Sequence, residues 1–369
     1  MRHGGWWNGA ALALTTCTHN ERLKCKRRAF NALIVAYRNQ RIGQSSVPLP
    51  SFLDEAHRLH SFAPPFRFSA FFSPEDTLLC ACASESALRR LKESNSERSY
   101  TRIAELTTGS GLVGFHLLQC DDRNRLIGLD VDCRATEVAE RNAKVLRLDR
   151  RAWFECADLW SESTLDTLAA YDPDLIVCNP PYVPEPRTEM LELEAGAGMD
   201  GTAHLIRAIE LASAIRPDAM TLSWCSLSDP RKVVQSAADA GYSLRSLFIV
   251  AIADGEYSGT VRDHLVALPH AYINESRETI AAVAPDGSAR FAYLLMAGDF
   301  MRDESEHRHD ADVVLSIQRL CERFRASGLS ALLNPEMTIP TNTWLLDRWG
   351  ELELRVILHG RDTYRKRAG

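Results

Sequence analysis

The chain alternates short apolar runs with segments of helical periodicity from about residue 102 to residue 297. The apolar runs predict strands near residues 102–107, 125–131, 152–157, 174–179, 219–225, 243–252 and 290–297. Helical segments separate them at about residues 111–120, 134–147, 161–170, 202–215 and 229–240, with a further helical stretch over 256–285. Strands that alternate with helices pair in parallel and form a doubly wound sheet. The fold class that we predict is therefore α/β, with seven strands in one sheet.

The segments that flank this core predict extensions. A helix is expected through residues 77–92, another near 311–327, and a pair of strands around 342–359. We divide the chain into a basic arm, an N-terminal helical or substrate segment, a central domain and a C-terminal extension, at residues 1–45, 46–100, 101–300 and 301–369.

The net charge of the chain indicates which class of partner it can bind. A net charge of -6 argues against a chain that binds nucleic acid through bulk positive charge. Basic residues do gather at 22–28 and at 365–367, and we interpret both runs as solvated surface or tails. The sequence also has no apolar stretch long enough to span a bilayer, so we expect no membrane partner.

The cysteines indicate whether the chain binds a metal and in which cellular compartment it lies. None of the ten forms a Cys-x-x-Cys pair, so we predict no metal site. Several fall in predicted strands or helices, namely Cys120, Cys156, Cys178 and Cys225. Buried free thiols fit a reducing compartment, and we expect a cytoplasmic protein.

The tetrapeptide Asn179-Pro180-Pro181-Tyr182 follows directly after the predicted strand at 174–179. Two prolines remove two backbone donors and restrict the turn, which leaves the Asn179 side-chain oxygen and the Pro180 carbonyl as fixed acceptors. Tyr182 supplies a flat face beside them. Two acceptors and an aromatic plane suit a planar NH2 group, so the motif predicts chemistry on an amide or a nucleobase amino nitrogen. The alternative is that the motif has only a structural role, as a proline-containing loop that leaves a sheet.

A strand, a glycine turn and a helix open the central domain. Gly109 and Gly111 allow a ligand to approach the backbone closely, and the helix that follows offers free N–H groups. Asp130 ends the next strand, nineteen residues after Gly111, where an acidic residue typically binds ribose hydroxyls. The alternative for Asp130 is that it only caps the next helix. Glu105 and Asp158 lie at the carboxyl ends of two further strands.

No Lys or Arg follows the glycines to neutralise a pyrophosphate. A cofactor with a ribose, an adenine and a positive charge therefore fits the predicted crevice better than a dinucleotide does. This description points to S-adenosyl-L-methionine as the cofactor.

The chain resembles the class I methyltransferases, and it is most similar to the family that methylates a glutamine amide of peptide chain release factors. The likeness covers roughly residues 66–300, and four stretches carry it: the proline-containing segment 72–77, the glycine loop 105–111, the strand end and tetrapeptide at 157–182, and Gly-Met-Asp-Gly at 198–201. The resemblance implies a Rossmann-like methyltransferase sheet.

The same resemblance implies roles for individual residues. Asn179, Pro180, Pro181 and Tyr182 would form the catalytic motif. The residues that would bind the cofactor are Glu105, Thr107, Gly109, Gly111, Asp130, Asp158 and Asn179. Among these, Asp130 would hold the ribose and Asp158 the adenine amino group. Two positions depart from the family: Glu105 replaces its Asp, and Thr107 replaces its first loop glycine.

The sequence therefore predicts an S-adenosylmethionine-dependent N-methyltransferase. We expect its partner to be a protein glutamine, as in a release factor, rather than nucleic acid. The alternatives are methylation of an amino group on an RNA or DNA base, and a cofactor-binding scaffold that has lost catalysis because of Thr107. We expect the small Thr107 side chain to leave the site usable.

Overall fold

The computed structural model describes residues 74–94, 99–186, 191, 193, 195–284, 287, 289–303, 308–346 and 354–359. The predicted arm at 1–45, the part of the N-terminal segment before residue 74 and the basic run at 365–367 lie outside the described residues.

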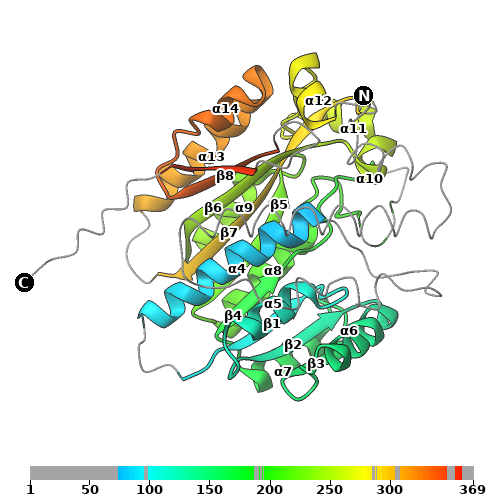
Figure 1. Cartoon of the computed structure of the whole chain (residues 1–369), viewed down its shortest axis with the longest axis vertical. Coiled ribbons are helices and arrows are strands. Elements are labelled where there is room, and N and C mark those ends of the chain that lie inside the picture. The colour runs from blue at the N-terminus through cyan, green and yellow to red at the C-terminus, as the bar shows by residue number, and fades with distance from the viewer. Residues whose placement is uncertain are drawn as a thin grey trace, which may run out of the picture.

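One twisted sheet forms the centre of the molecule (Figure 1). Its seven predicted strands are β1 (Arg102–Leu106), β2 (Arg125–Asp130), β3 (Ala152–Cys156), β4 (Leu175–Cys178), β5 (Ala219–Cys225), β6 (Tyr242–Ala253) and β7 (Ala292–Arg302). They lie in the order β3-β2-β1-β4-β5-β7-β6. The first five are parallel, and β7 is antiparallel to both β5 and β6. The predicted doubly wound α/β fold is confirmed.

The predicted count of seven strands is too low, because the C-terminal strand pair joins the same sheet. β8 (Thr341–Leu346) pairs in parallel with β6, and β9 (Leu354–His359) pairs antiparallel with β8. The sheet therefore has nine strands. The outer edge of β6 has backbone groups that need hydrogen-bond partners, and the strand pair supplies them.

Helices cover both faces of the sheet. On one face lie α4 (Pro74–Ser94), α5 (Leu112–Cys120) and α6 (Cys133–Val145), packed on side chains such as Ile103 and Val177. The neighbouring residues Ala104 and Ile176 point to the other face, as alternation along a strand requires. That face carries α7 (Glu162–Tyr171), α8 (Ala203–Ile215), α9 (Pro230–Asp239) and α13 (Arg308–Ser327).

Short helices complete the chain in the stretch between β6 and β7 and after α13. They are α10 (Glu256–Thr260), α11 (Arg262–Ala267), α12 (Arg277–Val283) and α14 (Ser330–Leu333). The helical interpretation of residues 256–285 is thus confirmed for most of that stretch.

Helix α4 lies across the sheet and joins its parallel and antiparallel parts (Figure 1). Its buried face carries Leu79, Ala83 and Leu91. Arg90 donates from Nε to the buried Asp299 carboxylate on β7, at 2.8 Å. Removal of one partner from such a pair leaves an uncompensated buried charge, so this contact fixes the register of α4 on the sheet.

The cysteines differ in part from the prediction. Cys178 and Cys225 are buried free thiols, as expected, but Cys156 is exposed and forms a disulfide with Cys133. The interpretation of Cys156 as a buried free thiol was wrong because its side chain points outward at the end of the edge strand β3. The bond joins the first residue of α6 to the last residue of β3.

Within the described residues, the helices are too short or too polar to cross a membrane.

Candidate active site

The predicted site residues gather at one edge of the sheet. Glu105 lies in β1, Asp130 ends β2, and Asn179 directly follows β4. Asp158 follows β3 by two residues. These four strands are parallel neighbours, so their carboxyl ends lie at one edge of the sheet, where a doubly wound sheet typically binds its ligand. We call this edge the crevice.

The loop after β1 has a backbone that suits close approach by a ligand. Gly109 and Gly111 have φ values of 54° and 80°, in the left-handed region that glycine adopts without strain. Gly111 is the N-cap of α5 and has no side chain to cap it. A Cβ at Gly111 would lie 2.7 Å from the Phe115 ring. The loop therefore keeps its shape only with glycine at this position.

Glu105 is occupied by this loop. Its Oε2 accepts hydrogen bonds from Thr108 Oγ1 at 2.8 Å and from the Gly114 backbone at 3.2 Å. Burial raises the pKa of the Glu105 carboxyl to about 8, although both hydrogen bonds oppose that shift. The Glu105 carboxyl therefore connects the turn after β1 to the start of α5. Its predicted contact with the cofactor stays a prediction.

Asp130 links the glycine loop to the end of β2. Its Oδ2 accepts from the Gly109 backbone at 2.8 Å, and its Oδ1 accepts from the Asp132 backbone at 2.9 Å. Each carboxylate oxygen has a second lone pair, so Asp130 can accept two more hydrogen bonds from hydroxyl groups. The capping alternative is wrong for Asp130, because Asp132 is the N-cap of α6.

Asp158 is exposed and opens the turn into α7. Its Oδ1 accepts from the backbone of Trp160 at 2.9 Å. The Trp160 ring is 52% exposed and meets the His204 ring edge-on, with centroids 4.9 Å apart. The second carboxylate oxygen of this exposed residue can serve as a further acceptor.

Thr107 has a left-handed backbone, with a φ of 56°. This explains why a glycine suits the position, since a β-branched residue is strained there. Its hydroxyl donates to the carbonyl of Leu106 at 2.5 Å and lies 3.8 Å from Cys178 Sγ. The side chain is thus directed back toward the strands.

Replacement of Thr107 by glycine is expected to raise the free energy of unfolding by about 1 kcal/mol, because left-handed strain costs an L-residue about 1–2 kcal/mol and glycine recovers part of it. Chemical denaturation would measure the change. Thr107→Val is the matched control, since it keeps the branched side chain and loses the hydroxyl. A Thr107→Gly protein less stable than Thr107→Val would contradict the strain argument.

Asn179 provides the most informative atom of the site. Its Oδ1 is buried and makes no hydrogen bond with any of the residues that the structure describes. Buried polar atoms nearly always have a partner, and an exception costs about 1–3 kcal/mol. An acceptor left open at a crevice is what a substrate N–H group would satisfy.

Tyr182 is more deeply buried than a ring that stacks on a substrate needs to be. Only 8% of the residue is exposed, and its hydroxyl donates to Asp76 Oδ1 on α4 at 2.5 Å. Burial, with the nearby Asp76 charge, raises the pKa of Tyr182 well above its usual value. The ring therefore anchors the tetrapeptide to α4.

The segment 195–201 supports the tetrapeptide from the other side. Val183 exchanges backbone hydrogen bonds with Ala195 and Ala197, at 3.0 and 3.1 Å. The Glu185 carboxylate accepts from the backbones of Leu191 and Gly198. Sequence reasoning missed Asp76 and Glu185 as supporting residues, although both lie inside or beside stretches that carried the resemblance.

Comparison with known proteins agrees with this geometry. Residues 82–195 match the family described as the methyltransferase small domain. The chain carries a methyltransferase domain. The match includes the glycine loop, the acidic strand ends and the tetrapeptide that together form the crevice.

Curated relatives are similar to this chain at the level of one methyltransferase family. A release factor glutamine methyltransferase of Rhodospirillum rubrum is 43% identical over 95 residues, which are 25% of this chain and 27% of that protein. The human MTRF1L release factor glutamine methyltransferase is 36% identical over 101 residues, or 27% of this chain and 30% of that protein. The resemblance to the release-factor family is confirmed. The chain spans less than half the length of these relatives.

Among solved structures, the E. cuniculi Mtq2–Trm112 complex, described as responsible for methylation of the eRF1 termination factor, has 18% sequence identity and a TM-score of 0.34. The matched region covers 63% of this chain and 98% of the chain in that structure.

Proposed function

We propose that this methyltransferase domain uses S-adenosyl-L-methionine to methylate the side-chain amide nitrogen of a glutamine in a release-factor-like protein. The observation that carries the proposal is the buried Oδ1 of Asn179 at the end of β4, which has no hydrogen-bond partner among the residues that the structure describes. It lies at the same sheet edge as the glycine loop and Asp130.

The residues of this crevice fit the proposed cofactor. Asp130 retains lone pairs for two ribose hydroxyls, and Asp158 keeps an acceptor for an adenine amino group. The glycine loop lacks the Cβ atoms that would keep a ligand away from its backbone. When bound, the cofactor supplies a methyl group on a sulfonium, which is a strong electrophile.

An amide nitrogen is a weak nucleophile because its lone pair is delocalised into the carbonyl. In our proposal, Asn179 Oδ1 and the Pro180 carbonyl accept hydrogen bonds from the two N–H groups and return electron density to nitrogen. This nitrogen would take the methyl group of a bound cofactor, which would leave as a neutral thioether, and the nitrogen would release one proton to water. Fixed acceptors of this kind are typically worth on the order of a hundredfold each.

The supporting contacts keep these acceptors in place. The Tyr182–Asp76 hydrogen bond ties the tetrapeptide to α4, and the Glu185 clamp ties the next residues to Gly198. Precise orientation of reactants can supply about 7–11 kcal/mol of rate enhancement at the upper end. We assign Tyr182 the role of positioning the tetrapeptide. Any exposed part of its ring would also contact the substrate.

A labelling experiment tests the proposed substrate. The full chain is incubated with methyl-labelled S-adenosylmethionine and a cell extract, and protein is separated from nucleic acid. We expect label in protein, and transfer to a glutamine-containing release-factor peptide but not to its Gln→Asn counterpart. Label in the nucleic acid instead would favour base methylation. Absence of cofactor binding at millimolar concentration would favour the inactive scaffold.

Asp130→Ala is expected to weaken binding of S-adenosylmethionine at least tenfold. Each hydrogen bond to a charged group contributes about 1.5–3 kcal/mol, and about 1.4 kcal/mol corresponds to tenfold. Isothermal titration calorimetry measures the affinity. Asp166→Ala, an exposed substitution on α7, is the matched control and should bind as the unmodified protein does. Unchanged affinity in folded Asp130→Ala protein would remove the ribose assignment.

A further inference from the structure

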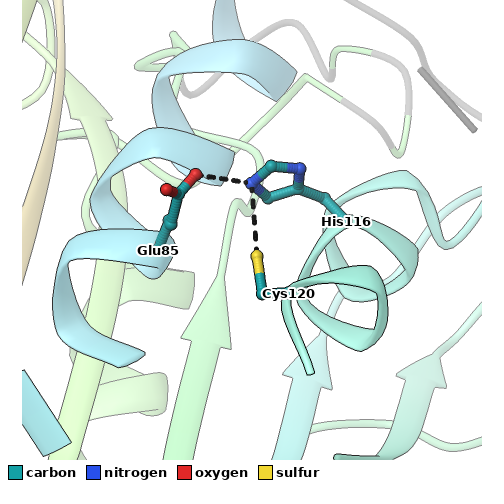
Figure 2. A group of neighbouring side chains, drawn as sticks. All are labelled: Glu85, His116 and Cys120. Atoms are coloured by element: carbon teal, nitrogen blue, oxygen red, sulfur yellow. Dashed lines mark hydrogen bonds and ion pairs between the residues drawn. The ribbon is translucent and has the colours of Figure 1, made fainter. Parts of the chain in front are cut away.

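Three side chains with metal-binding atoms converge between α4 and α5, outside the crevice. They are Glu85 on α4 and His116 and Cys120 on α5 (Figure 2). One carboxylate oxygen, one ring nitrogen and one sulfur all lie within 4.8 Å of one another. His116 and Cys120 are four residues apart on one helix, so they share a face. Figure 2 shows all three side chains directed toward a common point.

The cluster is sheltered by the helix pair. The side chain of His116 is 2% exposed and that of Glu85 is 18% exposed. Cys120 is intermediate in burial, at the last turn of α5. The site is therefore buried at His116 and partly exposed at Glu85 and Cys120, which form its rim.

Glu85 and Cys120 both approach the same atom of His116. The Nε2 to Oε2 distance is 3.0 Å, and the Nε2 to Sγ distance is 3.9 Å. A protonated Nε2 has one hydrogen to donate, and an unprotonated Nε2 has one lone pair. Neither state serves a carboxylate and a thiol on the same nitrogen well. A cation placed between the three atoms satisfies all of them at once.

We propose that Glu85, His116 and Cys120 form a zinc-binding site, with water as the fourth ligand. Sulfur, imidazole nitrogen and carboxylate oxygen are the donors that Zn²⁺ takes in proteins. On binding, the Cys120 thiol releases its proton to solvent and the thiolate bonds the metal, while His116 binds as neutral imidazole. Two negative ligands then balance the two positive charges, so the buried cluster carries no net charge.

Two of the three separations between the ligand atoms are close to what zinc requires. Bond lengths of about 2.0–2.3 Å in a tetrahedral site place neighbouring ligand atoms roughly 3.4–3.6 Å apart. The Nε2 to Oε2 distance lies a few tenths of an ångström below this range, and the Nε2 to Sγ distance a few tenths above it. The three atoms lie within 4.8 Å of one another, so zinc binding also requires side-chain rotations that draw the Glu85 oxygen and the Cys120 sulfur together around the metal.

The position of the site gives the metal a structural effect. Helix α4 carries Asp76, which anchors Tyr182, and α5 begins at the glycine loop. A metal bound across the two helices ties the support of the tetrapeptide to the support of the cofactor loop. The sequence-based expectation of no metal rested on cysteine spacing, and it could not register ligands from two helices that meet only in the fold.

Metal analysis of the full chain tests the site. After removal of metal with a chelator and dialysis against Zn²⁺, we expect one equivalent in the unmodified protein and in His264→Gln, a histidine control away from the cluster. Cys120→Ser and His116→Gln should lose that equivalent, and Glu85→Gln should bind at least tenfold more weakly. Circular dichroism of each metal-free variant reports whether it is folded.

Cobalt provides a second readout. Co²⁺ in the unmodified protein should give a thiolate-to-metal charge-transfer band that Cys120→Ser abolishes. Zn²⁺ should also raise the Tm of the unmodified protein by several degrees and leave that of Cys120→Ser unchanged. If His116→Gln does not fold, Cys120→Ser decides alone, since serine is close to cysteine in size. Failure to bind zinc, or binding that survives Cys120→Ser, overturns the proposal.

Discussion

Asn179→Ala is expected to lower methyl transfer by a hundredfold or more while changing cofactor affinity by no more than a few-fold. The substitution removes a buried acceptor that has no hydrogen-bond partner among the described residues and that we assign to the substrate N–H. Loss of one oriented polar group typically costs about 10²–10³ in turnover. Stability should not fall, because an atom without a partner contributes no hydrogen bond to the fold.

Single-turnover methyl transfer and thermal melts, measured together, separate the two effects. Asn179→Asp is the matched variant: it retains an acceptor and should be less impaired than Asn179→Ala, although its charge favours the sulfonium ground state. If the tetrapeptide were only a stiff loop, both variants would act through stability alone. Transfer by Asn179→Ala at the unmodified rate would show that the tetrapeptide is not the active site.

Gly201→Ala is expected to be the most disruptive single-methyl change near the crevice. Gly201 has a φ of 70°, and a Cβ built there would lie 2.5 Å from the carbonyl oxygen of Tyr182. It would also lie 2.9 Å from Ser228 Cβ. Since real side chains do not approach a backbone oxygen so closely, the tetrapeptide must move. A displacement of about 1 Å in a reacting group can cost on the order of a hundredfold in rate.

Gly287→Ala provides a matched control, because Gly287 has the same φ of 70° and its built Cβ meets no described residue within 4 Å. It should lose about 1–2 kcal/mol of stability from backbone strain and keep full activity. Gly201→Ala should lose about 1–3 kcal/mol more, which is the usual cost of forcing a methyl group into a packed site. Urea denaturation with activity assays compares the two. Equal losses of stability, with activity intact in both, would contradict the close approach.

The sequence predicted those features of the site that follow from local pattern. Asp130 and Asn179 were assigned correctly to strand ends because an apolar run followed by a polar residue marks where a parallel strand stops. The seven strand positions were equally local. The resemblance added the prediction that Gly109 and Gly111 bind a cofactor, since glycine alone indicates only that the backbone needs conformational freedom.

The features that the sequence did not predict depend on contacts between distant residues. Tyr182 and Asp76 are 106 positions apart, and neither residue type indicates the other. The disulfide depends on sheet register, in which Cys156 lies opposite Asp130 and so beside the start of α6. The two extra strands could be recognised as strands, but not as partners of β6, because pairing partners are decided by which edge remains open.

The position of β7 between β5 and β6 has a consequence for synthesis of the chain on the ribosome. β6 is a long, mostly buried strand that pairs only with β7 and β8, and both are translated after it. About 40 residues separate the end of β6 from the start of β7, which corresponds to roughly 2–8 s at ~5–20 residues per second. During that interval β1 to β5 can assemble, while β6 has no partner strand and its apolar residues remain available for aggregation. Helices α4 and α9, which pack on β6 and are translated before it, are therefore the elements available to shield it during that interval.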